Sequence, residues 1–140
     1  MFYKPLLYPL LIQVGLTFLV WLRMYQTRLA EIQATQIDPN ELATRRDSRR
    51  LLNNTAAADN FSNQFELPVL FYLAIMLALT LMLQDRVIVF LAWVFVILRV
   101  AHAIIHLSYN NVTHRFLVYV AGGLAVIGMW VRLGFYVISQ

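Results

Sequence analysis

The sequence contains no cysteine, and this absence excludes several kinds of chemistry. Without cysteine the chain can form neither a disulfide nor a thiolate metal site, and it has no protein thiol that could act as a nucleophile. Any thiol chemistry therefore requires a thiol supplied by a ligand. The three histidines occur in no HExxH or Cys/His spacing, so we predict no metal site.

Charge is also scarce, since charged residues make up 13% of the 140 residues and hydrophobic residues make up 61%. A soluble domain is roughly half apolar and could not cover this much apolar surface at this size. The long apolar runs have the length that a lipid bilayer requires. The composition therefore favours an integral membrane protein with a single domain over residues 1–140.

Four apolar runs predict four membrane-spanning helices, because each is close to the ~20 residues that a helix needs to cross a bilayer. They lie roughly at residues 5–24, 56–83, 87–109 and 116–138. No small-residue cleavage site follows the first run, so we expect a retained helix and not a signal peptide. Pro68 predicts a kink in the second run because it lacks a backbone N–H. The predicted fold is an all-α four-helix membrane bundle.

The basic residues gather in the loop between the first two runs, roughly at residues 25–55. Six of the eleven basic residues are arginines between Arg23 and Arg50. A basic cluster can indicate nucleic-acid binding, but beside membrane spans a cytoplasmic loop explains it, and we predict no nucleic-acid partner. Because the number of spans is even, both termini are predicted to be periplasmic.

Two of the apolar runs carry polar side chains that are costly in hydrocarbon. Asn63 and Glu66 lie one helical turn apart near the start of the second run. The third run carries one polar stripe at helical spacing, formed by Arg99, His102, His106 and Tyr109. We expect the two polar faces to meet near the cytoplasmic side. An ion pair between Glu66 and Arg99 and a pocket for an anionic or zwitterionic ligand are compatible interpretations.

The pattern NxxExP at residues 63–68, followed by RVAHxxxH at 99–106 and then by Arg115, resembles the MAPEG family. These are the membrane-associated proteins of eicosanoid and glutathione metabolism. The pattern is most similar to the branch of microsomal prostaglandin E synthases and glutathione transferases. There the third span carries RVAHxxxY, and a catalytic arginine follows at the spacing that separates Arg99 from Arg115. The resemblance implies a homotrimer that binds glutathione between subunits near the cytoplasmic side.

The resemblance also implies roles for individual residues. It implies a glutathione site lined by Asn63, Glu66, Arg99, His102 and His106. It makes Arg115 the catalytic residue that stabilises the glutathione thiolate, which is the competent nucleophile. The implied function is that of a glutathione-dependent transferase, isomerase or peroxidase acting on a lipophilic substrate that arrives from the membrane lipids.

Several positions depart from the family pattern. Asp59 stands where glutathione-binding members usually carry an arginine, so ligand carboxylates could be repelled there. His106 replaces the tyrosine of the third-span motif, with Tyr109 one turn later as a candidate substitute. Arg23 or Arg28 is the candidate first-span contributor. These departures indicate a bacterial-type member of the inner membrane and leave open a ligand other than glutathione.

Two other functions remain open on the sequence. In the first, the chain is a non-catalytic MAPEG-like lipid- or ligand-binding protein in which Asp59 has abolished thiol binding. In the second, it is a small proton-coupled multidrug exporter that uses Glu66 as its membrane carboxylate. The position of Glu66 at the start of its span and the basic residues of the third run argue against the exporter.

Overall fold

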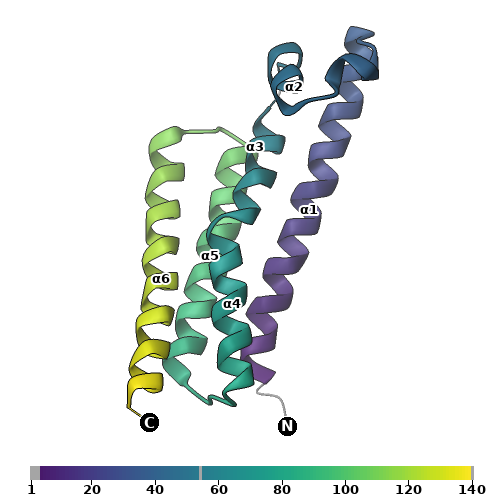
Figure 1. Ribbon diagram of the computed structural model, residues 1–140. Helices are drawn as coiled ribbons and strands as arrows, with labels where there is room; N and C mark the ends of the chain where they lie inside the picture. Colours follow the sequence, from purple (N-terminus) through teal and green to yellow (C-terminus); the bar gives the residue numbers. More distant parts are fainter. Residues whose placement is uncertain (1–3, 54, 140) are drawn as a thin grey trace.

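The computed structural model describes residues 4–53 and 55–139, and the described chain is built from helices. The elements in chain order are α1 (Lys4–Thr35), η1 (Pro39–Leu42), α2 (Arg45–Leu51), α3 (Ala56–Ser62), η2 (Asn63–Phe65), α4 (Leu67–Thr80), α5 (Arg86–Leu107) and α6 (Val112–Ile138). They form four long antiparallel rods, one of which is α3, η2 and α4 in series (Figure 1). Helix α1 begins and α6 ends at the same end of the bundle.

Four helical segments are long and apolar enough to cross a membrane, namely Lys4–Thr35, Ala56–Thr80, Arg86–Leu107 and Val112–Ile138. The predicted all-α membrane bundle is therefore confirmed. The first rod is longer than the apolar run that predicted it. At about 1.5 Å per residue it measures about 48 Å, whereas a bilayer core is about 30 Å thick. The C-terminal end of α1, together with η1 and α2, extends beyond the other three rods (Figure 1).

The second rod is interrupted at Glu66, where the backbone angles are φ −99° and ψ −106°. Pro68 lies in the first turn of α4, where its missing N–H leaves no helical hydrogen bond unmade. Helix α3 therefore ends at Ser62, and the single 3₁₀ turn η2 joins it to α4. The kink predicted from Pro68 is present as a break between two helices.

The core lies where α4, α5 and α6 meet. Phe71 and Phe95 stack at its centre, with ring centroids 4.6 Å apart. Gly128 lets α6 approach α5 closely, because a Cβ there would lie 3.1 Å from Cδ1 of Leu91. The small residues of the fourth run thus form a helix-packing face, as is typical of membrane helices.

Asp85 holds the turn between α4 and α5. Its Oδ1 accepts hydrogen bonds from the backbone N–H groups of Val87 at 2.7 Å and Ile88 at 3.2 Å, and its Oδ2 accepts from Nε of Arg132 at 2.7 Å. Partial burial by itself raises the pKa of Asp85, but the hydrogen bonds from Arg132, Ile88 and Val87 together bring it below its ordinary value of 3.8. Asp85 thus caps α5 and also ties it to the far end of α6.

Replacing Asp85 by alanine is expected to lower the free energy of unfolding by about 1 kcal/mol near neutral pH, because α5 loses its N-cap. Asp85→Asn is the matched control, since asparagine caps equally well and removes the charge that pairs with Arg132. Because the folded pKa lies below the unfolded one, the charge stabilises the protein above pH 3.8, and this contribution is lost as the pH falls through the lowered value. Thermal unfolding of wild type and Asp85→Asn should therefore converge in acid, and a constant difference would contradict the role of the charge.

Candidate functional site

Arg99 is buried inside the bundle, with 1% of its surface exposed. Its Nη2 donates a hydrogen bond of 2.9 Å to the backbone carbonyl of Asn63, which belongs to the turn η2. The regular helical ladder is interrupted there, so the guanidinium supplies a donor where backbone donors are scarce. Within the described chain, Nε and Nη1 of Arg99 make no hydrogen bond. Arg99 therefore fixes the break in the second rod and retains donors for a ligand.

Glu66 is exposed, and its Oε2 accepts a hydrogen bond of 2.8 Å from the hydroxyl of Tyr119 on α6. In the part of the chain that the structure describes, no direct hydrogen bond or ion pair joins Glu66 to Arg99. The non-helical backbone at Glu66 takes its side chain off the buried face of the rod. Tyr119 was not predicted from the sequence, although it follows Arg115 by one helical turn, and that spacing was the available signal.

His102 and His106 lie on the same inward face of α5 as Arg99, and each is 2% exposed. Their ring centroids are 5.8 Å apart, and the ring of His102 lies 5.9 Å from that of Tyr119. Among the described residues, both ring nitrogens of His106 lack a hydrogen-bond partner, and so does Nδ1 of His102. Buried polar groups usually have such partners, so these nitrogens are available to a ligand.

Arg115 lines a cavity of about 400 Å³ at the polar end of the bundle, which we call the Arg115 cavity. Its lining residues come from α3, α5, α6 and the adjoining loops, and they are Asn53, Thr55, Ala56, Asp59, His106, Asn110 and Arg115. Nη1 of Arg115 donates to Oδ1 of Asn110 at 2.7 Å, and its Nε is buried without a partner in the described chain. The structure thus brings the predicted catalytic arginine together with both family departures, Asp59 and His106.

Tyr109 does not join this group. Helix α5 ends at Leu107, and the backbone turns away through Ser108 and through Asn110, whose φ of 48° is left-handed. Tyr109 is consequently 61% exposed, and its hydroxyl lies 3.0 Å from Nδ1 of His114. The polar stripe predicted along the third span therefore stops at His106, because the helix itself ends before Tyr109.

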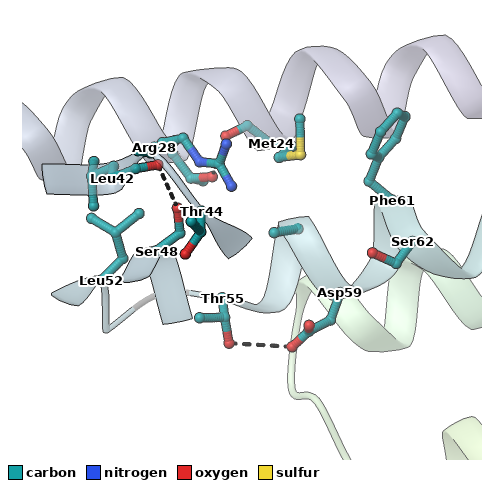
Figure 2. A pocket seen from close by; sticks show the side chains of 13 residues that line it. Met24, Arg28, Leu42, Thr44, Ser48, Leu52, Thr55, Asp59, Phe61 and Ser62 are labelled. Carbon is teal, nitrogen blue, oxygen red and sulfur yellow. Dashed lines mark hydrogen bonds between the residues drawn. The ribbon is translucent and has the colours of Figure 1, made fainter. Parts of the chain in front are cut away.

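A second cavity, of about 270 Å³, lies between the extension of α1, the segment from η1 to α2, and α3. We call it the loop cavity. Figure 2 shows Arg28 on its α1 side and Asp59 on its α3 side, where Oδ2 of Asp59 accepts a hydrogen bond of 3.2 Å from Thr55. Asp59 and Thr55 also line the Arg115 cavity, so the two cavities share a wall. Of the two first-span arginines considered, Arg28 lies at a cavity, whereas Arg23 is exposed and lines neither.

A network of buried side-chain amides connects α1 to the second rod. Nε2 of Gln13 donates to Oε1 of Gln64 at 3.0 Å, and Nε2 of Gln64 lies 3.3 Å from Oδ1 of Asn60. None of the three residues is more than 1% exposed. Hydrogen bonds between amides position membrane helices because unpaired amides are costly in hydrocarbon. This amide network holds η2, and with it Asn63, against α1.

An apolar groove lies between α1 and α4 and has a volume of about 480 Å³. Its lining residues are mostly aliphatic or aromatic, and they are Leu10, Val14, Thr17, Phe18, Trp21, Phe61, Phe65, Tyr72 and Met76. Phe61 lines both this groove and the loop cavity, so the apolar and the polar spaces adjoin.

The sequence matches the family model for the MAPEG family over residues 6–135. The match covers nearly the whole chain, and the chain therefore belongs to the MAPEG family, whose members are glutathione-related transferases or isomerases of membranes. With its four membrane-spanning segments it is a multi-pass membrane protein. No curated protein and no solved structure matches the sequence.

Proposed function

We propose that this chain is a glutathione-dependent transferase, isomerase or peroxidase that acts on a lipophilic substrate, with Arg115 stabilising the thiolate. The observation that carries the proposal is the place of Arg115 in a cavity of about 400 Å³ beside the buried, unpaired His106. A cation held in a partly dry cavity favours the thiolate of a bound thiol over the neutral form. Because the chain has no cysteine, the ligand supplies the reacting sulfur.

The charges around the two cavities match those of glutathione, which carries two carboxylates, one ammonium group and one thiol. Arg28 and Arg115 line the cavities. Arg99 lines neither of them, but it is buried and has two unpaired guanidinium nitrogens in the described chain. Arginine is well suited to carboxylates because its planar fork can bind them through two hydrogen bonds. Glu66 and Asp59 are candidate partners for the ammonium group. Asn63, His102 and His106 complete the proposed binding set.

The apolar groove between α1 and α4 supports a lipophilic second substrate. It adjoins the loop cavity through Phe61 and is lined almost entirely by apolar side chains. Ligand sites of this kind combine an apolar lining with a few polar groups that fix orientation. We also propose a homotrimer in a bacterial inner membrane, with the arginine-rich loop cytoplasmic and the termini periplasmic. The family membership and the arginine bias of the loop support this arrangement.

Titrating the purified protein with reduced glutathione tests the proposal directly. At 100 times its dissociation constant, a ligand that binds only the folded state stabilises it by about 2.7 kcal/mol. We expect a rise in the unfolding temperature and an ultraviolet thiolate band. S-methyl glutathione is the matched control, since it keeps the charges but has no ionisable thiol, and it should stabilise the protein without the band. If neither compound stabilises the protein at saturating concentrations, the glutathione proposal is wrong.

A non-catalytic lipid- or ligand-binding role is the second candidate, and the position of Asp59 favours it. This carboxylate lines both cavities and repels the carboxylates of an acidic ligand. Gain of glutathione binding in Asp59→Arg, together with no binding by the wild type, would favour this role. The exporter hypothesis gains no support, because Glu66 is exposed and hydrogen-bonded to Tyr119.

A further inference from the structure

Three ionisable side chains line the Arg115 cavity, and each comes from a different helix. Asp59 comes from α3, His106 from α5 and Arg115 from α6. His106 is 2% exposed, and neither of its nitrogens has a hydrogen-bond partner in residues 4–53 and 55–139. A buried imidazole without partners is costly to the fold. It is also able to accept a proton on one nitrogen while the other donates a hydrogen bond.

The charged groups that act on the His106 ring come from three helices. Asp59 on α3 is the carboxylate among them, whereas Arg99 on α5 and Arg115 on α6 are cations. The other titratable neighbour is His102, with its ring centroid 5.8 Å away on the same helix. In the unliganded cavity, burial of the ring and then the two arginines oppose a charge on His106. An anion bound beside Arg115 offsets their charge, and Asp59 then favours the imidazolium.

We propose that His106, supported by Asp59, accepts the proton of the ligand's thiol while Arg115 holds the resulting thiolate. In this step the S–H bond breaks, both electrons stay on sulfur, and a new N–H bond forms on the imidazole. The total charge of protein and ligand does not change, so no proton needs to reach bulk water. The inference rests on the proposed thiol function and adds the proton acceptor to it.

In this proposal the two departures from the family pattern, Asp59 and His106, serve the same proton transfer. His106 replaces the tyrosine of the third-span motif. Asp59 replaces the arginine that precedes the asparagine of the second-span motif. Asp59 and His106 are 47 residues apart in the sequence, yet both line the Arg115 cavity. A carboxylate that faces an imidazole is the usual means of stabilising an imidazolium during proton transfer.

The first test counts protons when reduced glutathione binds to the intact protein. Calorimetric titrations in two buffers with different protonation enthalpies give the protons released, and the ultraviolet thiolate band gives the thiolate formed. The wild type should form thiolate without releasing a proton to the buffer, because His106 retains it. In His106→Gln we expect about one proton released per thiolate formed, since Arg115 alone still favours the anion. His114→Gln removes an exposed histidine outside the cavity and should behave as the wild type.

Release of one proton per thiolate by the wild type, or an unchanged proton count in His106→Gln, would overturn the proposal. If glutathione does not bind at all, the proposed thiol function fails, and a second measurement still decides the Asp59–His106 pair. The histidine side chains are titrated by nuclear magnetic resonance without ligand in wild type and Asp59→Asn, which keeps both the imidazole and the size of residue 59. We expect the midpoint of His106 to be lower in Asp59→Asn than in the wild type, because the carboxylate favours the imidazolium. Identical midpoints would show that no such pair exists.

Discussion

Replacing Arg115 by alanine is expected to lower glutathione-dependent turnover of a lipophilic electrophile, such as an aryl halide, by about 100- to 1,000-fold. The substitution removes the cation of the Arg115 cavity and the hydrogen bond to Oδ1 of Asn110. Charge stabilisation by a preorganised donor acts mainly on the reacting anion, so kcat should fall more than KM rises. The measurement is steady-state kinetics on protein at a fixed ratio of protein to lipid.

Two further variants make the Arg115 experiment specific. Arg115→Lys keeps the charge but loses the planar fork, so we expect an intermediate loss. Arg132→Gln removes an arginine from the opposite end of α6, where the side chain is half exposed and paired with Asp85, and should retain turnover. Wild-type turnover in Arg115→Ala would remove Arg115 from the mechanism. An equal loss in Arg132→Gln would show that the effect is one of stability.

Replacing Arg99 by methionine is expected to destabilise the protein by about 1.5–3 kcal/mol, the usual value of a hydrogen bond to a charged group. The variant keeps much of the buried apolar stem but leaves the carbonyl of Asn63 without its side-chain donor. Because that bond fixes η2, the affinity for glutathione should fall as well. Thermal unfolding in detergent and ligand titration measure the two effects.

Arg99→Lys is the matched control, because it keeps the charge and a donor on a stem only one bond shorter, and it should recover part of the stability. A buried charge is also costly, and replacing one by an apolar group stabilises some proteins. An Arg99→Met variant more stable than the wild type would therefore mean that this cost exceeds the value of the bond. In that case Arg99 serves the ligand and not the fold.

Much of the fold could be predicted from local patterns. The apolar runs predicted four spans because bilayer thickness sets the length of a helix, and Pro68 predicted the break because a missing N–H acts locally. The stripe from Arg99 to His106 was predicted because a regular helix repeats its faces. The same regularity placed Tyr109 on the stripe, although the helix ends at Leu107. That end depends on the backbone at Ser108 and Asn110, which no hydrophobic period reveals.

The partners across the bundle could not be predicted in the same way. Tyr119 bonds Glu66 across 53 positions of the sequence, and Gln13 bonds Gln64 across 51. Such pairs depend on how deeply each rod is inserted and how it is rotated against its neighbours, and a single sequence carries no direct signal for either. The break at Glu66 adds to the difficulty, because the side chains on its two sides no longer follow one helical phase.

The adjoining polar and apolar spaces have a consequence for how such a catalyst would be measured. In the proposed reaction, a water-soluble thiol would reach the polar cavities at its bulk concentration, whereas a lipophilic reactant would reach the groove between α1 and α4 from the surrounding bilayer. Its effective concentration is then its mole fraction in the lipid or detergent phase. Adding more detergent at a constant total amount of reactant would slow the proposed reaction by surface dilution, with the protein itself unchanged. The apparent KM for that reactant is thus partly a property of the membrane.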